Sequence, residues 1–265
     1  MSDSPNESPF SGLPFFGDMA KAMSSQGPLQ WDVARQTAMM TALSGASSEP
    51  NVDPAARVGI EQLVPIADLH VRNHTGLDTV TAGKDPRVVV VNRSMWVHHT
   101  LESYKPLFTE LAQSLSATPA TSSTEIDSLQ DDPMANMMAS LNKMMAPAMM
   151  GMSVGTMVGQ LALRTFGQYD LPLPREPRDQ ILIVISNVDE FASDWSLATD
   201  DMRMWVLIHE LTSHAVLTSP HIREALSAAL SSYIAAFSPN PHALMDRLTN
   251  MDLGTGDPMA MMQKF

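Results

Sequence analysis

One stretch decides how this chain folds: TDDMRMWVLIHELTSHAVL, which runs from Thr199 to Leu217. Thr199 is a favourable helix N-cap, and Asp200 and Asp201 follow in the first turn, where the helix dipole stabilises carboxylates. Apolar residues then recur at helical spacing, which predicts a largely buried helix. These apolar residues are Met204, Val206, Leu207, Leu211, Ala215 and Val216.

Three polar side chains, His209, Glu210 and His214, interrupt this apolar surface. Buried imidazoles and carboxylates need partners, because burying a polar or charged group alone is costly. The pattern is close to H-E-x-x-H, in which two histidines one helical turn apart bind zinc and the Glu acts on a metal-bound water. Here the position four residues after His209 is Ser213, and the second histidine comes one residue later.

This one-residue displacement affects metal binding because of helix geometry. Positions i and i+4 lie about 40° apart around an α-helix, whereas positions i and i+5 lie about 140° apart. On a regular helix, His209 and His214 therefore cannot bind the same ion. A one-residue π-bulge between them would bring the two imidazoles together, so the spacing alone leaves zinc binding open.

Five stretches, spread over nearly the whole chain, carry a resemblance to a known family. They are GLPFFGDMA at 12–20, GPLQWDVAR at 27–35, GQYDLPLP at 167–174, and residues 187–195 and 205–216. Together they resemble an actinobacterial family of zincin-like proteins identified as zinc-dependent metalloproteases or hydrolases.

This resemblance implies a zinc site on the helix described above. Relatives usually read His-Glu-Leu-Thr-His, which implies a zinc ligand at His209 and a general base at Glu210. Ser213 occupies the second ligand position, where a neutral hydroxyl is a poor zinc ligand, and His214 is the extra neighbour. The family also implies a third ligand from a Glu-Gly pair in a later helix, and the sequence up to Phe265 has no such pair.

The acidic composition narrows the classes of function. With a formal net charge of -13 and no basic cluster, the chain is not expected to bind nucleic acid. The absence of cysteine removes disulfides and thiolate metal sites, and residues 1–7 lack the basic and apolar regions of a secretory signal. We therefore expect a cytoplasmic protein, and the resemblance to zincin-like proteins implies a peptide or protein as a possible substrate.

The distribution of residue types suggests one domain with two irregular segments. Residues 1–26 are rich in Ser, Pro and Gly, which predicts a mobile N-terminal tail. Residues 27–265 are expected to form a single zincin-like domain. An exposed linker is expected within it at about 116–132, where Ser, Thr, Ala and acidic residues show no apolar period.

Hydrophobic periodicity predicts a mainly helical fold with a few short strands, of the α+β class. The expected helices lie at about 30–43, 53–71, 92–115, 133–166, 199–217, 220–234 and 240–248. RVVVV at 87–91 predicts a strand whose candidate partner is the segment 79–81. QILIVIS at 180–186 predicts a strand that is apolar on both faces and therefore covered on both.

Methionine is unusually common, with 22 residues, and it dominates the predicted helix at 133–166. Gly151, Gly155 and Gly159 repeat there every four residues, which allows close approach of another helix. The hydropathy of the segment is too weak for a membrane span. We expect a central, buried helix whose methionines fill the core, with partner-binding grooves as the alternative.

Two histidine pairs stand outside the zincin stretch. His70 and His74 are four residues apart and share a face if their helix extends that far, where we expect partly exposed polar residues. His98 and His99 are adjacent, so their side chains point about 100° apart on a helix and do not chelate.

Two hypotheses about function follow. The first is a zincin-type zinc metallohydrolase, peptidase-like, with Glu210 as base and His209 and His214 as candidate ligands, impaired or inactive because of Ser213. The alternative is a non-catalytic zincin-fold protein that binds a partner through Met-rich helical grooves.

Overall fold

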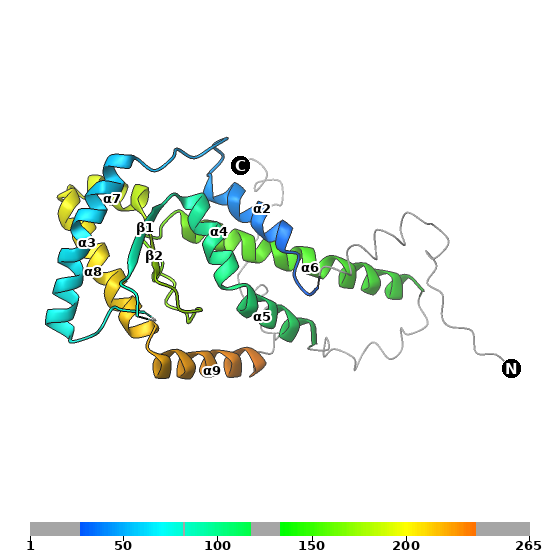
Figure 1. Cartoon of the computed structure of the whole chain (residues 1–265). Coiled ribbons are helices and arrows are strands. Elements are labelled where there is room, and N and C mark those ends of the chain that lie inside the picture. The colour runs from blue at the N-terminus through cyan, green and yellow to red at the C-terminus, as the bar shows by residue number, and fades with distance from the viewer. Residues whose placement is uncertain (1–26, 82, 118–132, 237–265) are drawn as a thin grey trace, which may run out of the picture.

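The computed structural model describes residues 27–81, 83–117 and 133–236, and most of these residues are helical (Figure 1). The strands form one two-stranded parallel sheet of β1 (Arg87–Val91) and β2 (Gln180–Val184), in register from Arg87 opposite Gln180 to Val91 opposite Val184. The predicted fold class, mainly α with short strands, is confirmed. The predicted pairing of β1 with residues 79–81 is wrong, because Thr81 instead bridges to Lys84.

The helices follow the predicted order with a few changed boundaries. They are α2 (Trp31–Ala42), α3 (Pro54–Thr75), α4 (Arg93–Ser103), α5 (Lys105–Ala117), α6 (Pro133–Ala162), α7 (Ile185–Asp194), α8 (Thr199–Leu217) and α9 (Pro220–Ala236). Asp53 caps α3 by accepting a hydrogen bond from the Ala55 amide at 2.9 Å, and Pro54 begins the helix as predicted.

The single helix predicted at 92–115 is two helices, α4 and α5, that meet at Tyr104. The Tyr104 side chain is buried, and its hydroxyl lies 3.0 Å from the Leu171 carbonyl and 3.1 Å from the Leu173 carbonyl. The helix axis thus changes direction where a buried aromatic residue is tied to a distant segment, and local periodicity does not reveal such a contact.

The two faces of the sheet supply two separate hydrophobic cores. Val91, Leu182 and Val184 pack with residues of α2, α4, α5 and α6. The alternate strand residues Val90, Ile181 and Ile183 pack with residues of α3, α7 and α8. This alternation follows from the period of two along a strand, and it confirms that β2 is covered on both faces (Figure 1).

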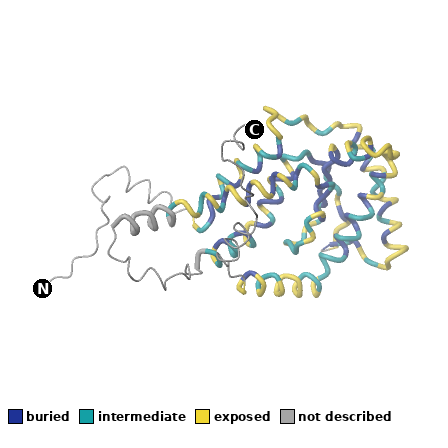
Figure 2. Tube along the Cα trace, turned by 180° about the vertical axis from the view of Figure 1, so that it is seen from behind, coloured by how far each residue is buried: buried dark blue, intermediate teal, exposed yellow. Residues whose placement is uncertain are grey.

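Over residues 144–162, the Met-rich helix α6 is buried along one face only, which corrects the expectation of a central helix with core methionines. Gly151, Gly155 and Gly159 lie against the backbone or Thr41 of α2, so the predicted close approach is confirmed. The opposite face of this part is exposed (Figure 2). Among residues 27–81, 83–115 and 144–236, Met202 is the one methionine that is buried.

Some predictions fall outside the described residues: the tail at 1–26, the helix at 240–248 and nearly all of the linker at 116–132. Within the described ranges, no helix has the length and apolar character needed to cross a membrane.

Candidate functional site

The central helix of the site is α8, which packs between α3 and α7 and against β2 (Figure 1). Its buried residues include Val206, Leu207 and Leu211, so the predicted amphipathic helix is confirmed. Its N-cap is Ala198 rather than Thr199, and no side chain caps that end. The helix is α-helical over its whole length, so the π-bulge that would align His209 with His214 is absent from it.

Glu210 points from α8 toward the turn formed by residues 165–170 and is fully buried there. Its Oε2 accepts hydrogen bonds from the main-chain amides of Gln168 at 2.8 Å and Tyr169 at 3.0 Å. The Tyr169 amide also lies 3.2 Å from Oε1. Arg203, a cation on the same helix, pairs with Asp189 at 2.9 and 2.7 Å and not with Glu210. Glu210 is therefore held by backbone amides.

Gly167 lets the 165–170 turn come this close to α8. A Cβ at residue 167 would lie 2.4 Å from the Cδ of Glu210, a distance that no side chain tolerates. Asp170 then closes the turn: one of its carboxylate oxygens accepts hydrogen bonds from the Phe166 amide, the Gly167 amide at 3.1 Å and the Thr165 hydroxyl at 2.9 Å. The turn is rigidly defined by its own polar groups.

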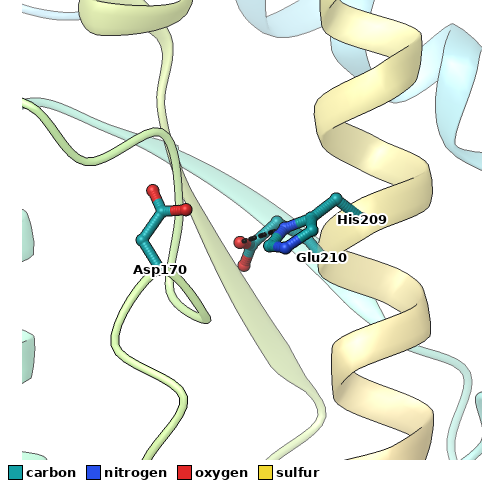
Figure 3. Close-up of side chains that lie close together, drawn as sticks. All are labelled: Asp170, His209 and Glu210. Carbon is teal, nitrogen blue, oxygen red and sulfur yellow. Dashed lines mark ion pairs between the residues drawn. The ribbon is translucent and has the colours of Figure 1, made fainter.

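His209 lies beside Glu210 and is half-buried, with 40% of its side chain exposed. Its Nδ1 is 3.4 Å from the Glu210 Oε1 (Figure 3). Its ring stacks on Trp205 with a centroid distance of 5.6 Å. Burial raises the pKa of Glu210. The hydrogen bond with Glu210 raises the pKa of His209. Each of the two groups therefore holds a proton more readily than it would in water.

His214 is buried on another side of α8 and is engaged at both ring nitrogens. Its Nε2 is 2.7 Å from the Thr81 hydroxyl, and its Nδ1 is 2.8 Å from the Tyr169 hydroxyl. Burial lowers the pKa of His214 to about 4, so the ring is neutral in the native state at pH 7. The structure does not bring His214 to His209, and its environment is that of a satisfied core histidine.

The side chains that converge with His209 are Glu210 and Asp170. One ligand atom from each lies within 4.8 Å of the other two, and Asp170 is exposed (Figure 3). Sequence reasoning missed Asp170, although it lies in the GQYDLPLP stretch that carries the family resemblance. The available signal was an acidic residue three positions after Gly167 in that stretch, but its distance from α8 in sequence hid the contact.

The donor set does not fit a zinc ion in the zincin arrangement. That arrangement needs a second imidazole one turn after His209, where the chain has Ser213. Zinc bonds of about 2.0–2.2 Å would also require the three converging groups to move closer together. The Glu210 oxygens would have to give up hydrogen bonds from buried amides, which costs about 1–3 kcal/mol for each unsatisfied group.

A pocket of the structure lies elsewhere, at the carboxyl ends of β1 and β2. It measures about 580 Å³, and neither His209, Glu210 nor Asp170 lines it. Its charged groups pair with one another or with helix ends: Arg93 with Glu190 at 2.7 Å, and Glu49 with the first amides of α4 at 2.8 and 2.9 Å.

The fold and site define a mainly helical protein in which one long helix carries a His-Glu pair against a glycine-containing turn. The family described as Zincin-like metallopeptidase matches residues 29–265, so the chain belongs to that family.

A solved structure from Chloroflexus aurantiacus, described as "a putative hydrolase with a novel fold", has a similar fold, with a TM-score of 0.54 at 19% sequence identity. The similarity covers 78% of this chain and 59% of that one, so this chain spans little more than half of its length. No curated protein sequence matches the chain.

Proposed function

We propose that this chain is a non-catalytic member of the zincin-like metallopeptidase family that acts by binding a partner. The observation that carries the proposal is the state of Glu210, which is fully buried and accepts hydrogen bonds from the Gln168 and Tyr169 amides. A general base must reach the proton that it abstracts, directly or through one water. Glu210 instead fastens α8 to the 165–170 turn.

The positions of the other motif residues support the same proposal. Ser213 replaces the second imidazole of the family pattern, and His214 is committed to Thr81 and Tyr169. His209 thus lacks the partner that would create a two-histidine zinc site on α8. Loss of one ligand accounts for loss of catalysis without loss of the fold, because the fold of this region rests on hydrophobic and amide contacts.

The experiment measures zinc content and peptide hydrolysis for the wild type and the Ser213→His variant. We expect no stoichiometric zinc and no zinc-dependent hydrolysis in the wild type, with undiminished thermal stability under chelator. Ser213→His places an imidazole four residues after His209 and should gain zinc. Ser153→His, on the exposed face of α6, is the matched control and should gain none.

One outcome would favour a different function. The convergence of Asp170, His209 and Glu210 within 4.8 Å supports a zinc-dependent hydrolase with an unusual ligand set as a second candidate. That function requires near-stoichiometric zinc in the wild type, lost in both His209→Ala and Asp170→Asn, together with hydrolysis that Glu210→Gln abolishes. This result would replace the non-catalytic proposal.

The binding role draws support from the exposed face of α6. Met145, Met149 and Met152 follow one another at helical spacing and are 50%, 59% and 55% exposed. Flexible thioethers on a helix face suit the apolar side of an amphipathic partner helix. Substitution of all three by Ser should weaken binding of a labelled amphipathic helical peptide, while Met95→Ser on α4 should not. Equal binding by both variants would contradict this use of α6.

A further inference from the structure

Two exposed histidines lie side by side near the C-terminal end of α3. The helix extends to Thr75, beyond its predicted end, so His70 and His74 lie one turn apart on the same face. Their rings are nearly parallel, with an interplanar angle of 8° and a centroid distance of 5.9 Å. Within the described residues, neither ring forms a hydrogen bond or an ion pair that would account for this arrangement.

The pair borders a pocket between α3 and α8. The pocket measures about 260 Å³ and is lined by His70, Val71, His74 and Thr75 of α3 and by Met204, Ile208 and Thr212 of α8. A water occupies about 30 Å³ of liquid volume, so the space accommodates a metal ion with several water ligands. The pocket therefore combines two imidazoles with a thioether and hydroxyl groups.

We propose that His70 and His74 bind one late first-row divalent transition-metal ion, with Cu²⁺ held most tightly. Imidazole is a suitable ligand for copper, nickel and zinc, and affinity along this series peaks at Cu²⁺. Two histidines at positions i and i+4 approach one ion by small side-chain rotations, since they already lie on one helix face. Water and the Thr212 hydroxyl complete the coordination, and the polarisable thioether of Met204 lines the pocket beside the ion.

The site is separate from the His209–Glu210 site, although α8 contributes residues to both. It shares no residue with the Asp170, His209 and Glu210 cluster, and the α8 residues that line it do not include His209. The pair His98 and His99 serves as a comparison, because it lacks the geometry that favours binding of one ion by both rings. His98 and His99 have a similar centroid distance of 5.6 Å, but they are adjacent in sequence and their rings lie at 65°.

The experiment titrates the full chain with Cu²⁺, Ni²⁺ and Zn²⁺, each alone, by calorimetry, and records the electron paramagnetic resonance spectrum with Cu²⁺. We expect one site of highest affinity for Cu²⁺ with a nitrogen-ligand signature. Removal of a residue that only hydrogen-bonds to a metal ligand weakens metal binding by about 10–100-fold. Removal of a ligand itself, in His70→Ala or His74→Ala, should therefore weaken this site by at least about tenfold.

The matched control keeps the number of histidines. Leu69→His combined with His70→Ala places the first imidazole five positions before His74, about 140° away around the helix, and should lose the site like His70→Ala. Leu69 is exposed and does not line the pocket. His98→Ala and His209→Ala should both leave the site intact. The proposal fails if the Leu69→His/His70→Ala variant binds Cu²⁺ like the wild type, or if His209→Ala removes the site.

Discussion

The two helical layers that cover the sheet are held to their neighbours by different kinds of contact. On the α2 and α6 side, glycines of α6 allow direct backbone approach: a Cβ on Gly155 would lie 2.5 Å from the Ala34 carbonyl oxygen. On the α3, α7 and α8 side, α8 is tied to distant segments by buried polar groups, chiefly Glu210 and His214.

This difference in the kind of contact determines which residues each layer requires, including those of the His-Glu motif on α8. Both layers contain a glycine at the closest contact, but Gly167 approaches a carboxylate rather than a helix backbone. The α2–α6 contact depends on the absence of a side chain, because a Cβ at Gly151, Gly155 or Gly159 would lie 2.5 Å from an atom of the facing segment. The α8 contact requires particular donors and acceptors, so a motif associated with catalysis can persist for stability alone. Three predictions test this contrast, from the largest expected effect to the smallest.

Glu210→Ala should destabilise the fold most. It leaves the amides of Gln168 and Tyr169 buried without an acceptor and opens a cavity, and we expect a loss of about 4 kcal/mol. Urea denaturation monitored by circular dichroism gives this value. His209→Ala, which removes the half-buried neighbour, should cost about 1 kcal/mol or less. Comparable losses in both variants would mean that the ion pair, rather than the amide contacts, holds α8.

Acidification should destabilise the α8 side through His214. Its pKa is lowered from 6.5 to about 4, so below pH 6.5 the unfolded chain binds a proton that the native state does not. Stability is therefore lost as pH falls from about 6.5 to about 4, by roughly 3 kcal/mol in total. The raised pKa of Glu210 has the opposite effect on stability as pH falls. The prediction therefore concerns the difference in stability between the wild type and a variant that lacks His214.

That difference is measured with His214→Gln, which keeps a polar partner for Tyr169 and Thr81. Urea denaturation of both proteins between pH 4 and 7.5 should show that the stability gap narrows steadily as pH falls, because only the wild type carries the buried imidazole. Parallel pH profiles would show that His214 is not protonated differently in the folded and unfolded states.

Gly155→Ala should show the steric character of the α2–α6 contact. The added methyl group meets backbone atoms that cannot move aside, and we expect a loss of about 2 kcal/mol. Gly59→Ala is the matched control inside α3, where the nearest atom is the end of the Arg203 side chain at 3.3 Å. There the higher helix propensity of Ala should stabilise the protein by up to about 1 kcal/mol. Thermal melts of both variants check this prediction. Equal changes in melting temperature would mean that the α2–α6 contact is loose.

Much of the fold followed from local signals. The Asp53-Pro54 start of α3, the β-branched run at 87–91 and the doubly apolar run at 180–184 each predicted their element. The pairing of β1 with β2 did not, because it joins strands almost ninety positions apart across three helices. The break at Tyr104 likewise depends on carbonyls of Leu171 and Leu173, which no local pattern contains.

The features of the candidate site likewise divide into those that local sequence signals determine and those that tertiary packing determines. The sequence by itself determined that α8 is a helix, that His209 and His214 lie on different sides of it, and that Ser213 occupies a ligand position. These follow from 3.6 residues per turn and the chemistry of each side chain. Tertiary structure alone decided that Glu210 is covered by the 165–170 turn, that Asp170 stands beside His209, and that His214 meets Thr81 and Tyr169. Such contacts arise when distant segments pack, and the periodicity of one helix does not encode its neighbours.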